Sequence, residues 1–148
     1  MADHLELSFA LVAEVEMPGV REDDLASLAA SVLSAEGAAG AWDVTVALVD
    51  DARLQALHRD FMGVDEPTDI MTFPAGNGAP GGGDLVISAD HARTQSTAWG
   101  FTPEEEVRFL VVHGLLHLLG WRDEREEERE RMLARQRDLL DGWRQASN

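Results

Sequence analysis

Apolar residues recur along the chain in two spacings, which together predict four strands and five helices. Alternating apolar and polar positions, rich in β-branched residues, are typical of strands. They occur at residues 5–15, 42–49, 70–73 and 84–87. Apolar positions three or four residues apart predict helices. They occur at residues 25–36, 52–61, 89–99, 103–119 and 124–143. Because the two kinds of element follow one another without strict alternation, we expect an α+β fold. Its small, mostly four-stranded mixed sheet packs on about five helices.

Local signals support the starts of four helices. Asp50 and Ser88 stand where an N-cap is needed, and Asp23-Asp24 can cap the first helix. The strongest start is Thr102-Pro103-Glu104-Glu105, which combines a capping box with proline at the first helical position.

Two helices differ in how much of their surface is apolar. The helix at residues 103–119 is apolar on most sides, which predicts a buried position at the centre of the fold. The helix at residues 52–61 has a single apolar stripe, so we expect Leu54, Leu57 and Phe61 to face inward.

A glycine-rich stretch at residues 75–83 separates the third and fourth strands. Glycine resists fixation in one conformation, so we expect a flexible loop. The stretch lacks the Lys-Thr or Lys-Ser ending of a phosphate-binding loop, which argues against a nucleotide site of that kind.

Length and composition predict a single domain over residues 1–148. With 148 residues and 45% hydrophobic content, the chain can bury about two-thirds of its unfolded surface. The absence of cysteine excludes disulfides, thiolate ligands and cysteine nucleophiles. We see no signal-peptide pattern and no apolar run near the ~20 residues of a membrane span. We therefore expect a cytoplasmic location and no membrane partner.

The net charge of −16, with arginine supplying all 12 basic residues, opposes nonspecific binding to nucleic acid. No DNA partner is expected, although a local arginine cluster could still contact RNA. The acidic run at residues 124–130 is interleaved with arginines, which is typical of a solvated helix face.

The helix at residues 103–119 carries two histidines four residues apart. His113 and His117 therefore share one helix face, close enough to bind a single metal ion. Gly120 ends the helix, which lets the chain turn back and bring Asp123 toward the same point. Two imidazoles and a carboxylate leave a fourth position for water, as in catalytic zinc sites. We therefore predict a metal-dependent hydrolase with His113, His117 and Asp123 as ligands.

Each of these residues also has a purely structural interpretation. A histidine on a buried helix is often a core residue with a hydrogen-bond partner, although two buried rings need such partners to offset their desolvation. Asp123 stands where the last helix should have its N-cap, with Glu126 as capping-box partner. A carboxylate has two oxygens, so the roles of cap and ligand are not exclusive.

Gly114 separates this motif from that of the zinc proteases. Those enzymes carry a glutamate directly after the first histidine, as general base. Gly114 has no side chain to accept a proton, which disfavours a peptidase mechanism.

Three blocks of sequence resemble the YbeY endoribonucleases, a family of rRNA maturation factors. Residues 113–123 (HGLLHLLGWRD) resemble His-Gly-x-x-His followed by Gly, an aromatic residue, Asp and a third His, with Arg122 and Asp123 at the last two of these places. Residues 65–74 (DEPTDIMTFP) are similar to Asp-x-Pro-Thr-Asp-Val-Leu-Ser-Phe-Pro. The third block is residues 83–88 (GDLVIS), followed by Ala92, Gln95 and Gly100. Their order and spacing match the family over most of residues 48–123.

The resemblance implies one Zn2+ ion held by three side chains in a single-strand-specific endoribonuclease. It implies 3′-end maturation of 16S rRNA and ribosome quality control, with rRNA, the small ribosomal subunit and assembly proteins as partners. The family's first two ligands fall on His113 and His117. The third falls on Asp123, where the family usually has histidine. The added charge should weaken the ion as a Lewis acid and favour other, harder divalent metals.

The charge-stabilising and proton-accepting groups are less defined. A family arginine implicated in RNase activity falls on Met62. Arg59, one helical turn earlier, or Arg122 could instead stabilise negative charge on the phosphate, although Arg59 also fits a surface residue. Asp69 and Asp84 are candidate general bases, and either could simply brace a turn.

Two other functions stay open. One is a ribosome-assembly or RNA-binding factor with a structural metal and little nuclease activity, which the acidic surface and Met62 favour. The other is a metal-dependent hydrolase of another substrate, including a peptidase, which Gly114 disfavours.

Overall fold

The computed structural model describes residues 4–75 and 81–147. It contains every strand and helix that the apolar pattern predicts. In chain order these are β1 (Leu5–Ala13), α1 (Glu22–Ala35), β2 (Gly40–Val49), α2 (Asp51–Met62), β3 (Ile70–Pro74), β4 (Gly81–Ser88), α3 (Ala89–Trp99), α4 (Pro103–Leu118) and α5 (Glu126–Ser147). No helix in these two ranges is both long and apolar enough to cross a membrane.

The strands form one four-stranded mixed sheet in the order β1-β2-β4-β3. β2 pairs in parallel with both β1 and β4, whereas β3 pairs antiparallel with β4. The predicted α+β class with a small mixed sheet is confirmed. Because β3 lies at the end of this order, one of its edges has no strand partner within the sheet.

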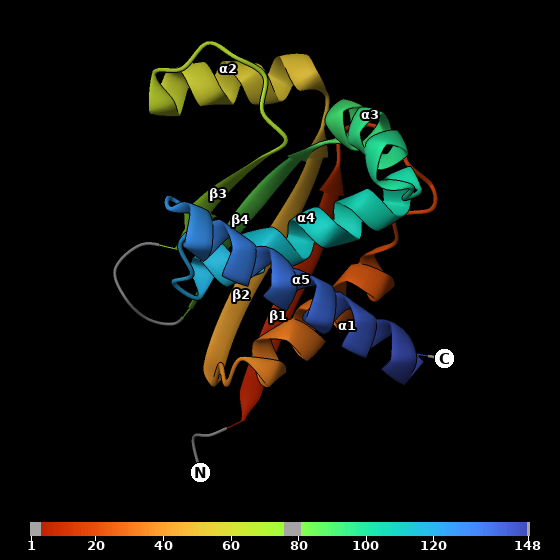
Figure 1. Ribbon diagram of the computed structural model, residues 1–148, viewed down its shortest axis with the longest axis vertical. Coiled ribbons are helices and arrows are strands. Elements are labelled where there is room, and N and C mark those ends of the chain that lie inside the picture. Colours follow the sequence, from red (N-terminus) through yellow and green to blue (C-terminus); the bar gives the residue numbers. More distant parts are fainter. Residues whose placement is uncertain (1–3, 76–80, 148) are drawn as a thin grey trace.

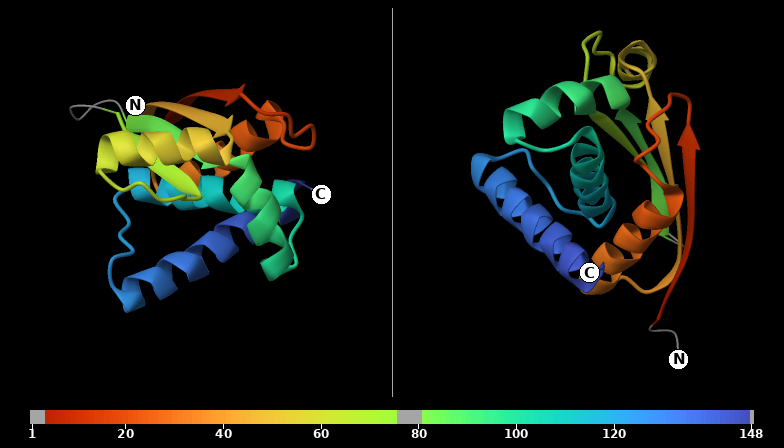
Figure 2. Two further views of the ribbon diagram at one scale, coloured as in Figure 1. Left: turned by 90° about the horizontal axis from the view of Figure 1, so that it is seen from above. Right: turned by 90° about the vertical axis from the view of Figure 1, so that its right-hand side faces the viewer.

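The helix α4 lies between the sheet and α5, as the right-hand view of Figure 2 shows (Figures 1 and 2). It contacts β3 and β4 on one side and α1, α3 and α5 on the others. Side chains that alternate along β2 and β4 pack against it, namely Val44, Val46, Leu48, Leu85 and Ile87. The prediction of a buried central helix is confirmed, and its histidines are therefore fixed by packing on several sides.

The helix α2 packs on the opposite faces of the same strands. Val49 and Val86 alternate with the core residues of β2 and β4, and they form a small cluster with Leu54. The prediction that Phe61 faces inward is wrong, because its side chain is 66% exposed. The last turn of α2 extends past this small cluster, so only its first turns have a buried face.

The capping signals are confirmed at three of the four helices. Asp50, Ser88 and Thr102 each accept a hydrogen bond from a backbone amide in the first turn of the following helix. The prediction that Asp23-Asp24 caps the first helix is wrong, because α1 begins at Glu22. The Glu22 carboxylate accepts a hydrogen bond from the Leu11 amide at 2.9 Å, which fixes the helix start against β1.

The end of the glycine-rich stretch belongs to the sheet. Residues 76–80 lie outside the described ranges, but Gly81, Gly82 and Gly83 are part of β4 and not of the predicted loop. Gly82 has a φ of 128°, and a Cβ added there would collide with the backbone of Asp43. These glycines are needed because neighbouring strands approach too closely for side chains.

Replacing Gly82 with alanine should destabilise the fold by about 3 kcal/mol or more, because a strained backbone and a clash with backbone atoms add together. Gly37→Ala is a matched control. Its φ is also positive, at 79°, but nothing lies within 4 Å of the added Cβ. That variant should lose only about 1 kcal/mol. Urea unfolding of both variants measures the difference, and equal losses would contradict a close approach of the strands at Gly82.

Candidate metal centre

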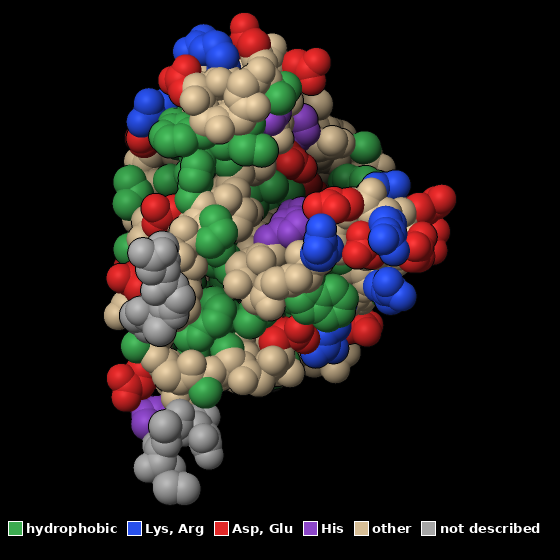
Figure 3. Space-filling view, turned by 90° about the vertical axis from the view of Figure 1, so that its left-hand side faces the viewer, with side chains coloured by type: hydrophobic (Ala, Val, Ile, Leu, Met, Phe, Trp, Pro, Cys, Tyr) green, Lys and Arg blue, Asp and Glu red, His purple; other side chains and the backbone are tan. Residues whose placement is uncertain are grey.

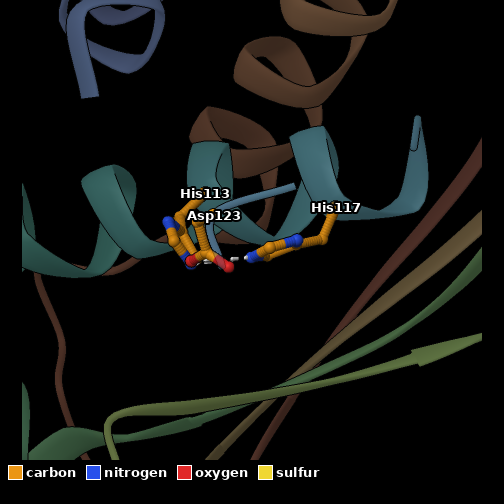
Figure 4. Close-up of side chains that lie close together, drawn as sticks. All are labelled: His113, His117 and Asp123. Atoms are coloured by element: carbon orange, nitrogen blue, oxygen red, sulfur yellow. Dashed lines mark hydrogen bonds and ion pairs between the residues drawn. The ribbon is translucent and has the colours of Figure 1, made fainter. Parts of the chain in front are cut away.

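The three predicted ligands come from the end of α4 and the turn that follows it. His113 and His117 lie one turn apart on α4, and Gly120, with a φ of 101°, reverses the chain. The Trp121 amide donates to the Leu116 carbonyl at 2.9 Å, which holds the reversed chain against the helix. The Asp123 side chain consequently points at both histidines (Figure 4).

The distances between the three side chains suit one small ion. His113 Nε2 and His117 Nε2 are 3.1 Å apart, and Asp123 Oδ2 lies 3.3 Å from His117 Nε2 and 3.6 Å from His113 Nε2. A tetrahedral zinc ion with bonds of about 2.1 Å keeps its ligand atoms about 3.4 Å apart. The three atoms therefore fit three corners of a zinc site.

Hydrogen bonds on the outer nitrogens fix the tautomers of both histidines. His117 Nδ1 lies 3.0 Å from the Trp121 carbonyl oxygen, and His113 Nδ1 lies 3.1 Å from the Gln136 side-chain oxygen. Both oxygens only accept, so each Nδ1 must carry the proton. Two Nε2 lone pairs and one carboxylate oxygen then converge on the same point. This arrangement repels itself without a cation and is that of metal-bound histidines.

Sequence reasoning missed Gln136. Its side chain is only 1% exposed, and its amide nitrogen donates to the Phe109 carbonyl at 3.5 Å, which leaves its oxygen for His113. The available signal was a polar residue inside the apolar stripe of the last helix, between Met132 and Leu139. A buried glutamine needs partners, and His113 supplies one.

Asp123 does not cap α5. That helix begins at Glu126, three residues later, and the Arg125 amide at its start donates a hydrogen bond to the Glu128 carboxylate at 2.9 Å. Arg129 donates to the Asp123 backbone carbonyl at 3.3 Å, which ties the ligand turn to α5. The capping interpretation is wrong, and the Asp123 carboxylate is left for the histidines.

Gly114 faces the sheet. A Cβ added there would lie 2.6 Å from Leu85 Cδ2 and 3.1 Å from Ile70 Cδ1. A glutamate at this position would have to displace side-chain atoms of Leu85 and Ile70. The zinc-protease arrangement, in which that residue reaches the metal water, is therefore disfavoured by packing as well as missing from the sequence.

A groove of about 480 Å³ opens beside the histidines and crosses β3 toward α2. Its size is in the range of small-molecule sites. Its lining residues are His58, Phe61, Met62, Asp69, Ile70, Met71, Thr72, Phe73, His113 and His117. Figure 3 shows this hollowed face, with histidine side chains at its centre and hydrophobic side chains beside them.

The two predicted catalytic arginines lie outside this groove. Arg59 forms an exposed ion pair with Asp60 at 3.1 Å, and Arg122 forms one with Glu124 at 3.0 Å. Exposed pairs of this kind are weak, so either guanidinium can leave its partner. A role for either one in catalysis requires that movement.

The two predicted bases differ in position. Asp69 lines the groove. Asp84 is exposed and alternates along β4 with Leu85, which packs beneath Gly114. Asp84 therefore lies on the far face of the sheet from the histidines.

Glu106 lies two turns before His113 on α4 and is 4% exposed. Burial, and secondarily the charge of Asp69, raises the pKa of Glu106 to about 7. One of its carboxyl oxygens has no hydrogen-bond partner among the described residues. The folded protein therefore keeps a proton on Glu106 that the unfolded chain loses near pH 4.5.

Glu106→Gln should remove a pH-dependent loss of stability. The pKa of Glu106 is higher in the folded protein than in the unfolded chain. Its contribution to the free energy of unfolding is therefore fully present below pH 4.5 and is lost as pH rises through about 7. The variant should gain about 3 kcal/mol relative to wild type between pH 4 and 8. Urea unfolding of both proteins across this pH range measures the difference between their free energies of unfolding. The contributions of the other titrating groups cancel in that difference. A difference that does not vary with pH would contradict it.

A family model described as endoribonuclease YbeY matches residues 11–144. The chain is 40% identical over 124 residues to endoribonuclease YbeY of Pelotomaculum thermopropionicum, with 78% of this chain and 82% of that protein covered. It is 33% identical over 152 residues to endoribonuclease YbeY of Bacillus licheniformis, with 93% and 96% covered.

The fold also has a solved counterpart. The solution structure of TM1509 from Thermotoga maritima superposes with a TM-score of 0.62 and 23% identity, over 94% of this chain and 93% of that one. This likeness supports the fold, whereas the family match extends through the histidines and the turn at Asp123. On these matches, the chain belongs to the endoribonuclease YbeY family.

Proposed function

We propose that this protein is a metal-dependent endoribonuclease that hydrolyses phosphodiesters in single-stranded RNA. The observation that carries the proposal is the convergence of three lone-pair donors, His113, His117 and Asp123, at one end of an open groove. The family relatives, which are named endoribonucleases, supply the substrate class.

His113, His117 and Asp123 would hold one Zn2+ ion. When bound, such an ion lowers the pKa of its water and polarises a phosphoryl oxygen. The aspartate brings its own negative charge to the site, which leaves room for another divalent metal with a stronger preference for oxygen.

Two side chains of the groove can accept a proton from the attacking water. Asp69 offers a carboxylate. His58 Nδ1 lies 2.9 Å from the Glu66 carbonyl oxygen, which fixes the proton on Nδ1 and leaves Nε2 free to accept one. Arg59 or Arg122 would add positive charge only after leaving its carboxylate partner.

The cellular role we infer from the family resemblance is rRNA processing in the cytoplasm. The substrate would be the 3′ end of 16S rRNA, presented on the small ribosomal subunit together with assembly proteins. A factor that binds RNA but cuts little is the second candidate. The net charge of −16 and the position of both arginines outside the groove favour it.

Cleavage of a labelled single-stranded RNA that spans the 3′ end of the small-subunit rRNA tests the proposal. Zinc-loaded protein should cut it, dialysis against a chelator should stop cutting, and added zinc should restore it. The same RNA annealed to its complement should resist. RNA binding without cutting in any metal state would support the assembly factor. Peptide cleavage in a protease panel would instead support another hydrolase.

A further inference from the structure

The groove beside the candidate metal centre is poor in positive charge. No arginine or lysine is among its lining residues in the described part of the chain, and the sequence contains no lysine at all. The chain as a whole carries a net charge of −16. Phosphate contacts, which dominate most RNA binding, are therefore weak here. Affinity for a single strand has to come mainly from its bases.

The groove instead presents an exposed aromatic ring. The side chain of Phe61, on the last turn of α2, is 66% exposed. Phe73 of β3 contacts it edge to face, with ring centroids 5.4 Å apart and an angle of 74° between the rings. Phe73 is itself half-buried, so it holds the Phe61 ring in place while leaving much of it open. Met62, next along the helix, is 65% exposed and adds a flexible apolar contact.

This ring lies along the path that a substrate must take. Phe61 and Phe73 line the same groove as His113 and His117. A nucleotide chain whose phosphodiester reaches the histidines therefore has its neighbouring nucleotides beside α2. Bases of a single strand can turn out and stack on aromatic side chains, whereas bases inside a duplex are already stacked.

We propose that Phe61, held by Phe73, is the stacking platform for an unpaired base adjacent to the cleaved phosphodiester. The proposal rests on the proposed endoribonuclease function and extends it to a substrate-positioning residue. It accounts for single-strand preference without phosphate-binding arginines. Stacking on one aromatic residue changes RNA affinity by about five- to a hundredfold.

Fluorescence anisotropy measures the affinity of zinc-loaded protein for a labelled single-stranded RNA. A gel run on the same samples establishes that the RNA is uncut when its binding is measured. Phe61→Ala should bind about five- to a hundredfold more weakly. Phe61→Tyr, which keeps the ring, should stay near wild type. Trp99→Ala is the matched control, because Trp99 is 62% exposed but lines a different hollow, with Phe101 and Phe109.

A second arm removes the base instead of the ring. A series of RNAs, each with one abasic nucleotide, should contain one whose affinity for wild type falls as far as that of Phe61→Ala. The same abasic RNA should bind Phe61→Ala no more weakly than intact RNA does. The platform would be overturned if each abasic nucleotide weakened the binding of Phe61→Ala as much as that of wild type. It would also be overturned if wild type and Phe61→Ala bound intact RNA with equal affinity.

The two proposals fail differently. Cutting by wild type with no effect of Phe61→Ala overturns the platform and leaves the endoribonuclease function standing. RNA that binds through Phe61 but is never cut overturns the nuclease and leaves Phe61 only as a base-stacking residue of an RNA-binding groove. Absence of both binding and cutting overturns both.

Discussion

Replacing His117 with alanine should lower kcat/KM for RNA cleavage by about a thousandfold or more. His117 supplies one of the three donor atoms, and without it the ion has only His113 and Asp123 from the protein. The two remaining donors, 3.6 Å apart, fill only two of the four corners of a tetrahedral zinc site, so the metal should be lost or displaced. Initial rates on the single-stranded RNA measure the loss.

The matched control is His91→Ala, which removes a histidine from α3, where its ring contacts Gln95 and not the metal centre. That variant should cut like wild type. Circular dichroism of both variants establishes that they are folded. His117→Ala that is folded and still cuts at more than a tenth of the wild-type rate would remove the metal from the mechanism.

Replacing Asp123 with alanine should lower metal affinity by more than about a hundredfold, whereas Asp123→His should keep or tighten it. The Asp123 oxygen lies 3.3 Å from His117 Nε2, so the carboxylate is placed to share the ion. Histidine is a good zinc ligand without a charge, and it should raise the Lewis acidity of the ion.

Metal content after gel filtration measures this prediction. Glu124→Ala is the control, because the neighbouring carboxylate is exposed and pairs with Arg122 at 3.0 Å. Its metal content should equal that of wild type. Unchanged metal in Asp123→Ala would show that the carboxylate only positions the turn.

The elements of the fold could be predicted because their signals are local. Asp50, Ser88 and Thr102 each accept a hydrogen bond from the amide three residues later, so both partners lie within one short stretch of sequence. Phe61 shows the limit of that logic. Its place in an apolar stripe is a property of the helix, whereas its exposure depends on where the sheet ends.

The glycines of β4 show the same limit. A glycine-rich stretch predicts flexibility when nothing else is known. Gly82 is instead required by the approach of the Asp43 backbone, from a strand about 40 residues away in sequence. Only the pairing of β2 with β4 reveals this.

The candidate site was predictable in its ligands but not in its supports. His113 and His117 follow from helical spacing alone. Asp123 fits a ligand or a cap equally well in sequence, and the start of α5 at Glu126 argues against the cap. Gln136 is 23 residues from its histidine, so no short motif contains the pair.

The hydrogen bond from His113 to Gln136 has a thermodynamic consequence. It fixes the histidine tautomer that presents a lone pair to an ion, and it also holds α5 against α4. By linkage, the free energy that the docking of α5 adds to ion binding equals the free energy that a bound ion adds to the docking of α5. A bound ion would therefore stabilise the docking of α5, which gives it no ligand, and a partner that binds α5 would change the affinity for metal.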